Sequence, residues 1–169
     1  KAIETATEII NSFDKIYEDR WISMMRKKLG IPNVHEKDKS LILDLLFWMH
    51  QKKVDYTNTF CHLMNIEISK EKIYEDREFN NWKKRWKKRL LTKEKLNKKS
   101  LELMKNVNPI VIPRNHKVEE ALREADKEKF TTVKDLVKIL SKPYTLQKNV
   151  IDYQKILNSN EKYQTFCGT

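Results

Sequence analysis

The stretch Asp38-Lys-Ser-Leu-Ile-Leu-Asp-Leu-Leu-Phe-Trp-Met-His-Gln-Lys52 decides the fold class of this chain. Its large apolar side chains would cover most of the circumference of a helix: Leu41, Ile42, Leu45, Leu46, Trp48 and Met49. A helix that is apolar on most sides is a buried helix. The pattern therefore predicts a helix over 38–52 that is the most buried element of an all-α fold.

Two amphipathic helices are predicted before this stretch. The first, over residues 2–18, has apolar side chains at helical spacing: Ile3, Ala6, Ile10, Phe13 and Tyr17. The second, over 19–29, carries Trp21, Met24, Met25 and Leu29. Gly30, with Pro32 just beyond it, is predicted to end this second helix.

Further helices are predicted after the central stretch. Asp55 is a predicted N-cap for a short helix that carries Phe60, Leu63 and Met64. A helix over 76–91 aligns four large side chains on one stripe: Phe79, Trp82, Trp86 and Leu90. Thr92 is predicted to cap the next helix, with Leu96, Leu103 and Met104 facing inward.

Prolines mark the remaining boundaries. Residues 108–113 must be extended or turning, since each proline disfavours helix at the residue before it. Val118, Ala121, Leu122 and Ala125 then predict a seventh helix, and an eighth opens at Thr131 or Thr132 and ends by Pro143. Residues 145–169 have weak periodicity and predict a less regular tail on the surface. We therefore expect one unit over 1–169, a single irregular all-α bundle of seven to eight helices with an extended C-terminal tail.

Composition excludes several classes of protein. The chain has 169 residues but only two glycines, Gly30 and Gly168, so neither glycine-rich phosphate-binding motif is possible. Two cysteines cannot form a disulfide framework, so we expect a reducing compartment, the cytoplasm. No apolar run approaches a membrane span, and the first residues resemble a helix and not a signal peptide. The chain begins without Met, which suggests a fragment or a processed product.

The net charge of +11 raises the question of an acidic partner. Residues 83–99 hold ten Lys or Arg side chains against one acid, Glu94, with Trp82 and Trp86 close by. A free-standing basic helical domain that binds nucleic acid through these residues is the alternative hypothesis. We favour a solvated helix face, because both tryptophans align with Phe79 and Leu90 and should point into the core. Nucleic-acid binding is thus not expected.

No catalytic or metal-binding constellation is predicted. The four histidines lack the spacing of metal ligands, and no pair of carboxylates stands out as an acid and a base. Cys61 is expected to be a buried thiol beside a surface imidazole, His62. Cys167, in contrast, lies beside Gly168 in the tail, where a thiol would be accessible to oxidation or exchange.

The segment Asn108-Pro-Ile-Val-Ile-Pro-Arg-Asn-His116 is unlike ordinary helix sequence. Asn115 would cap the helix that follows, and Arg114 would bind a carboxylate or the terminal carbonyls of another helix. A guanidinium near a helix N-terminus is also suited to binding an anion. We favour a tertiary clamp over an anion site.

These segments resemble the C-terminal region of the selenoprotein O family, also called YdiU. The resemblance rests on the block from Asn108 and Pro109 to Pro113, Arg114, Asn115 and His116 and on the ending Tyr163-Gln-Thr-Phe-Cys-Gly-Thr169. The stretch Asp55-Tyr-Thr57-Asn-Thr-Phe60 and Lys142-Pro143-Tyr144 agree with it. Cys61 departs from it, since the family usually has Arg there.

The resemblance implies a protein adenylyltransferase with a kinase-like fold, which transfers AMP from ATP to hydroxyls of Ser, Thr or Tyr in proteins. Family members are longer, and their ATP- and Mg²⁺-binding residues lie upstream of the part that matches. The resemblance thus implies a non-catalytic helical portion without ligands for a cofactor or metal, with the upstream kinase-like core as its partner and protein substrates for the whole enzyme. It also implies a redox role for Cys167, where eukaryotic relatives carry selenocysteine.

Overall fold

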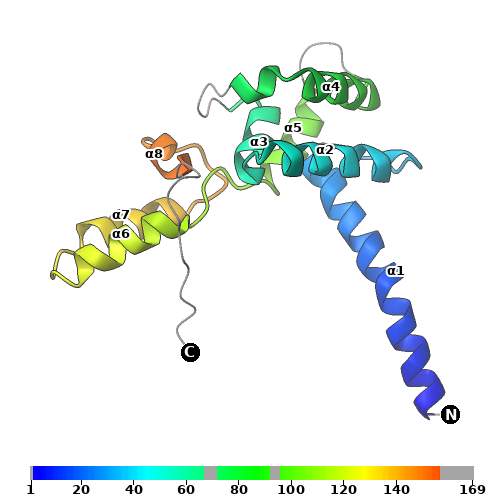
Figure 1. Ribbon diagram of the computed structural model, residues 1–169, viewed down its shortest axis with the longest axis horizontal. Coiled ribbons are helices and arrows are strands. Elements are labelled where there is room, and N and C mark those ends of the chain that lie inside the picture. Colours follow the sequence, from blue (N-terminus) through cyan, green and yellow to red (C-terminus); the bar gives the residue numbers. More distant parts are fainter. Residues whose placement is uncertain (1, 67–71, 92–95, 157–169) are drawn as a thin grey trace. The chain divides into compact units, whose positions relative to one another are not determined.

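The computed structural model describes residues 2–66, 72–91 and 96–156 (Figure 1). Every regular element in these ranges is a helix, which confirms the all-α prediction. The elements are α1 Ala2–Lys28, α2 Asp38–Lys52, α3 Tyr56–Leu63, the 3₁₀ helix η1 Lys72–Glu75, α4 Arg77–Arg89, α5 Lys98–Lys105, α6 Asn115–Ala125, α7 Thr131–Leu140 and α8 Val150–Gln154. The described residues divide into two compact units. Those within Lys1–Lys53 and Lys72–Met104 form the first, and those within Val54–Glu71 and Lys105–Thr169 form the second.

The prediction of two separate helices over 2–18 and 19–29 is wrong, because α1 is one continuous helix. No glycine, proline or capping side chain interrupts the chain near residue 18, so the backbone has no reason to leave the helix there. The predicted stop is correct. The backbone N–H of Gly30 donates to the Lys27 carbonyl (3.0 Å), and that of Ile31 donates to the Arg26 carbonyl (2.9 Å). These two bonds form the glycine-dependent motif that commonly ends a helix.

Gly30 also marks the place where the end of α1 meets α5. Its φ of +68° lies in the left-handed region, and a Cβ there would lie 2.9 Å from the Ser100 carbonyl oxygen and 3.0 Å from Cγ of Met104. Met25 and Leu29, which lie shortly before Gly30, are also fully buried. The carboxyl-terminal end of α1 is therefore fixed in the core of the first unit.

The centre of the first unit is an aromatic stack between α2 and α4. Trp48 of α2 stacks on Phe79 of α4 with ring centroids 4.5 Å apart, and the series continues through Trp82 to Trp86. The buried indole N–H groups donate to backbone carbonyls, Trp82 to Leu41 (2.8 Å) and Trp86 to Leu29 (2.9 Å). Burial of these rings therefore leaves no indole donor unsatisfied.

Side-chain caps define the starts of several helices. Asp55 accepts from the backbone N–H of Asn58 and caps α3, as predicted, while Asp76 accepts from Glu78 and Phe79 and caps α4. The helix expected after Thr92 begins later, at Lys98, where the Asn97 side chain accepts from the N–H of Ser100 (2.8 Å). Thr92 itself lies outside the described residues, and Leu96 precedes α5 instead of belonging to it.

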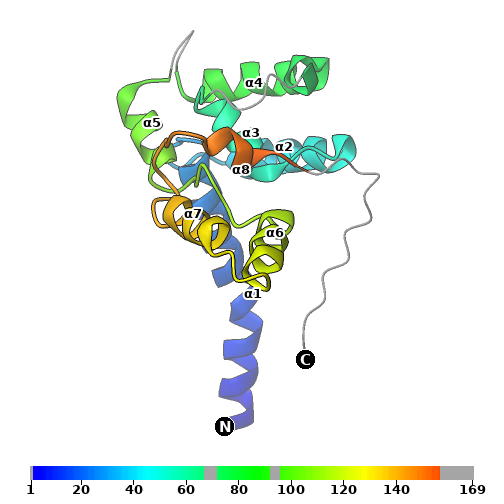
Figure 2. The same cartoon turned by 90° about the vertical axis from the view of Figure 1, so that its left-hand side faces the viewer.

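The second unit is built on the pair α6 and α7, which lie side by side in both views (Figures 1 and 2). Ala121 of α6 and Leu136 and Ile139 of α7 are buried. Within the predicted tail, the short helix α8 buries Val150 and Gln154. This part of the tail therefore contributes to the core of the second unit and does not only lie on its surface.

The amino-terminal half of α1 differs from the rest of the first unit. Every residue from Ala2 to Tyr17 is exposed, including the apolar stripe recognised in the sequence. Figure 2 shows this part of α1 running away from α2. Among the described residues, no helix combines the length and the apolar character needed to cross a bilayer.

Candidate functional site

An ion pair between Asp55 and Arg114 is the centre of the second unit. Nη1 of Arg114 lies 2.8 Å from Oδ2 of Asp55, and Nη2 lies 3.0 Å from Oδ1. Nη2 also donates to Oδ1 of Asn58 at 3.2 Å. The two charged side chains are only 10% and 16% exposed. The structure thus confirms that Arg114 binds a carboxylate, in the two-pronged geometry that favours guanidinium over ammonium.

Local backbone structure brings these two residues together. Asp55 precedes α3 in an extended conformation, and its carboxylate already accepts the N–H of Asn58. Arg114 is extended as well, with φ −73° and ψ 133°, immediately before α6. The prediction that Asn115 caps α6 is wrong: Asn115 is the first helical residue, Arg114 holds the cap position, and no side chain caps this end.

The surroundings of Asp55 act on its carboxyl group in opposite directions. Burial alone would raise its pKa, because it penalises the charged form. Hydrogen bonds from Arg114 and from the Asn58 backbone stabilise the carboxylate, and together they leave the pKa of Asp55 below its usual value. The pair is therefore ionised at neutral pH.

Asn58 and Gln154 extend the ion pair into a buried polar network. Nδ2 of Asn58 donates to the Gln154 carbonyl (3.2 Å), and Nε2 of Gln154 donates to the Ile110 carbonyl (2.7 Å). Both side chains are almost fully buried. Gln154 was not predicted from the sequence, because it lies in a segment without helical periodicity and glutamine is not a residue type that is usually buried.

The proline-bracketed segment is held by its backbone. The N–H groups of Ile110 and Val111 both point at the Pro143 carbonyl, at 2.7 and 3.3 Å. Asn108 and both of these apolar residues are buried, whereas Pro113 is exposed. The Lys142-Pro143-Tyr144 segment therefore contacts this block directly.

Two further residues of the Asp55–Phe60 stretch, Thr57 and Phe60, differ in burial. Phe60 is buried and packs edge-on against Tyr56, with ring centroids 4.9 Å apart. Thr57 is half-buried. Cys61 is buried beside them, and its Sγ lies 3.7 Å from the Pro109 carbonyl oxygen, so the thiol is a structural donor.

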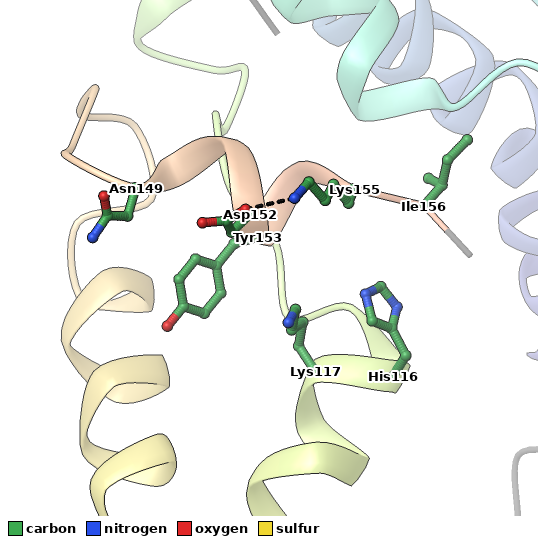
Figure 3. A pocket seen from close by; sticks show the side chains of 7 residues that line it. All are labelled: His116, Lys117, Asn149, Asp152, Tyr153, Lys155 and Ile156. Carbon is green, nitrogen blue, oxygen red and sulfur yellow. Dashed lines mark hydrogen bonds and ion pairs between the residues drawn. The ribbon is translucent and has the colours of Figure 1, made fainter. Parts of the chain in front are cut away.

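His116 lies at the rim of a hollow of about 500 Å³ (Figure 3). Its lining comes from the start of α6 and from α8 with its flanks: His116, Lys117, Asn149, Asp152, Tyr153, Lys155 and Ile156. Lys117 lies 6.0 Å from the centre of the Tyr153 ring and pairs with Glu120, while Lys155 pairs with Asp152. The lysines of the hollow are thus already engaged with groups of this chain.

The two tryptophans within and beside the basic segment 83–99 are not exposed to solvent. Trp82 and Trp86 are 3% and 2% exposed, and their rings stack on each other with centroids 5.8 Å apart. They point into the core, as expected, so neither can stack on a nucleic-acid base. Residues 92–95 of this segment lie outside the described residues.

A metal site would require several ligands in one place. In the part of the chain that the structure describes, no group of three His, Cys, Asp or Glu side chains is placed to hold a metal ion. Cys167, the predicted redox residue, lies outside the described ranges.

Comparison with known proteins identifies the family. Residues 2–141 match the model of the family described as protein adenylyltransferase SelO. The chain is 46% identical over 170 residues to the protein nucleotidyltransferase YdiU of Pelagibacter ubique (strain HTCC1062), and 44% identical over 171 residues to that of Clostridium botulinum (strain 657 / Type Ba4). Each alignment covers 100% of this chain but 35% of the relative. The chain therefore belongs to the SelO family and spans about a third of the length of these curated relatives.

Proposed function

We propose that this chain is the C-terminal helical portion of a SelO-family protein adenylyltransferase. In this proposal the chain supports a kinase-like core on the same polypeptide, and that core transfers AMP from ATP to hydroxyls of Ser, Thr or Tyr in protein substrates. The chain itself supplies no catalytic residue. The two relatives named above are nucleotidyltransferases of which it matches 35%, which leaves room for such a core.

The observation that carries the proposal is the internal pairing of the motif residues. Arg114, the best candidate for binding a phosphate, directs both terminal nitrogens at Asp55 and Asn58. Its partners belong to this chain, and the ion pair is largely buried. A guanidinium engaged in this way is a tertiary clamp, since an anionic ligand would have to displace a buried carboxylate.

ATP and Mg²⁺ do not fit the residues present. Gly30 serves as a helix end packed against Met104, and a chain with two glycines has no glycine-rich loop to surround a phosphate. The described residues also lack a cluster of carboxylates that would hold Mg²⁺. We therefore assign both groups to the core of the full-length enzyme and derive no catalytic step here.

Calorimetry with Mg-ATP tests this assignment. The 169-residue chain should give no saturable heat, while the full-length protein should bind. Arg114→Ala in the full-length protein should retain affinity for ATP, provided that the variant remains folded. Saturable binding of ATP by the chain alone would refute the proposal.

We further propose that Cys167 is a redox-regulatory cysteine, whose oxidation changes the activity of the full-length enzyme. In the full-length protein, Cys167→Ser should abolish the dependence of AMP transfer on reductant. Cys61→Ser is the matched control, because the Cys61 thiol is buried against the Pro109 carbonyl and should not take part. A Cys167→Ser enzyme that still responds to reductant would show that the tail cysteine is inert.

A further inference from the structure

We propose that the exposed apolar side of the first half of α1 is a docking surface for the part of the SelO-family polypeptide that this chain does not contain. We call this surface the α1 face and define it by six residues: Ile3, Ile9, Ile10, Phe13, Ile16 and Tyr17. The inference rests on the proposed function, because it assigns the contact between the helical portion and the rest of the enzyme to a particular helix.

The α1 face has the register of a helix that packs on another apolar surface. Ile3, Ile10 and Tyr17 are seven residues apart, and Phe13 falls between the last two at the position that completes a heptad pattern. Ile9 and Ile16 repeat at the same interval and widen the stripe on one side. Phe13 and Tyr17 stack with ring centroids 6.1 Å apart. The two rings therefore form one aromatic patch at the carboxyl-terminal end of the α1 face.

These side chains are exposed to an extent that is unusual for their type. Ile3 is 82% exposed, Ile10 70% and Phe13 62%. Soluble proteins seldom leave large apolar side chains contiguous on one face unless the face meets a partner. Helices in proteins also owe most of their stability to packing of an amphipathic face, and this half of α1 has no such packing.

The relatives indicate which surface covers the α1 face. The family match begins at residue 2 and the relatives align with the whole chain, so α1 belongs to the shared family region. Those relatives have about two thirds of their length outside this chain. A covering surface on the same polypeptide acts at an effective concentration of roughly millimolar, whereas a second copy must be recruited from solution.

The charge of the first half of α1 predicts the charge of the surface that covers it. Residues 2–20 contain five acidic side chains, Glu4, Glu8, Asp14, Glu18 and Asp19, against the basic Lys15 and Arg20, a net charge of −3. The whole chain carries +11, so residues 2–20 are an acidic segment of an otherwise basic protein. Complementary potentials are usual across an interface. The covering surface should therefore be apolar with a basic rim.

Amide hydrogen exchange in the full-length protein tests the proposal. The amides of residues 5–17 should exchange about 100-fold more slowly there than in the 169-residue chain, because docking suppresses local opening of the helix. Ile10→Asp/Phe13→Asp should return exchange to within about threefold of the isolated chain. Asn11→Asp/Lys15→Gln changes the net charge by the same amount on the opposite side of α1 and should keep the protection.

Each other outcome has a defined meaning. Equal exchange in the full-length protein and the isolated chain would overturn the proposal, as would equal effects of the two double variants. Protection that rises with the concentration of the isolated chain would identify a second copy as the occupant and would also overturn it. AMP transfer is measured on the same full-length sample, so an active enzyme with rapid exchange in α1 refutes the docking surface alone. An inactive enzyme with α1 protected refutes the proposed function alone.

Discussion

The first half of α1 and the helix α4 show the same sequence pattern but differ in their surroundings. Both have large apolar residues at helical spacing along one side. In α4 the stripe is buried: Phe79 is 0% and Trp86 2% exposed. In α1 the corresponding stripe is exposed, with Phe13 at 62%. Helical periodicity therefore identifies a face that is suited to burial. Which surface covers that face depends on the tertiary structure.

The largest expected loss of stability follows from a substitution in α4, whose apolar stripe is buried. Trp86→Ala removes a buried indole and its hydrogen bond to the Leu29 carbonyl, and should lower the free energy of unfolding by about 3–5 kcal/mol. Phe13→Ala, the matching deletion in α1, should change it by less than about 0.5 kcal/mol in the 169-residue chain. Urea unfolding followed by circular dichroism measures both. Similar losses for the two variants would show that the α1 face is already covered in this chain.

Arg114→Ala tests a contact between segments far apart in the sequence. It leaves the carboxylate of Asp55 buried without its partner and should cost about 3 kcal/mol in the same experiment. Arg123→Ala on the exposed side of α6 is the control and should cost less than about 0.5 kcal/mol. Equal losses of unfolding free energy for the two variants would mean that the Asp55–Arg114 pair stabilises the fold no more than an exposed charge does.

Much of this arrangement was predictable from sequence, and the failures have physical causes. The α4 stripe, the cap at Asp55 and the helix end at Gly30 follow from local rules, and the structure confirms them. The sequence predicted that Arg114 would bind a carboxylate, but it could not identify Asp55 as the partner. The two residues are 59 positions apart, and tertiary packing brings them together. Gln154 was missed for the same reason. Asn115 was misassigned, since a residue type suited to capping is also tolerated in the first turn.

Gly30→Ala sharpens the contrast between the two ends of α1. The new Cβ would meet the Ser100 carbonyl oxygen at 2.9 Å in a left-handed backbone conformation, so we expect a loss of about 2 kcal/mol. The control is Lys53→Gly, which places glycine at a position that is already left-handed (φ 52°) and should change stability by less than about 0.5 kcal/mol. A neutral Gly30→Ala would mean that this end of α1 is not tightly packed.

The smallest effect is a response to acid at the start of α4. The backbone N–H of Phe79, with help from Lys52 and Trp48, lowers the pKa of Asp76 from 3.8 to about 2. Because the folded pKa is the lower one, this stabilisation is present above pH 3.8 and is lost as the pH falls toward about 2. The urea midpoint should decline over that range. Asp76→Asn keeps a capping side chain that does not titrate and should reduce the decline, and an unchanged decline would contradict the assignment.

We propose the α1 face as an interface whose other side lies elsewhere in the same polypeptide. The exchange rate of the Phe13 amide, compared between the 169-residue chain and the full-length SelO-family protein, tests this most directly. We predict rapid exchange in the chain at every protein concentration and exchange slower by about 100-fold in the full-length protein. The same rapid exchange in both would contradict the claim.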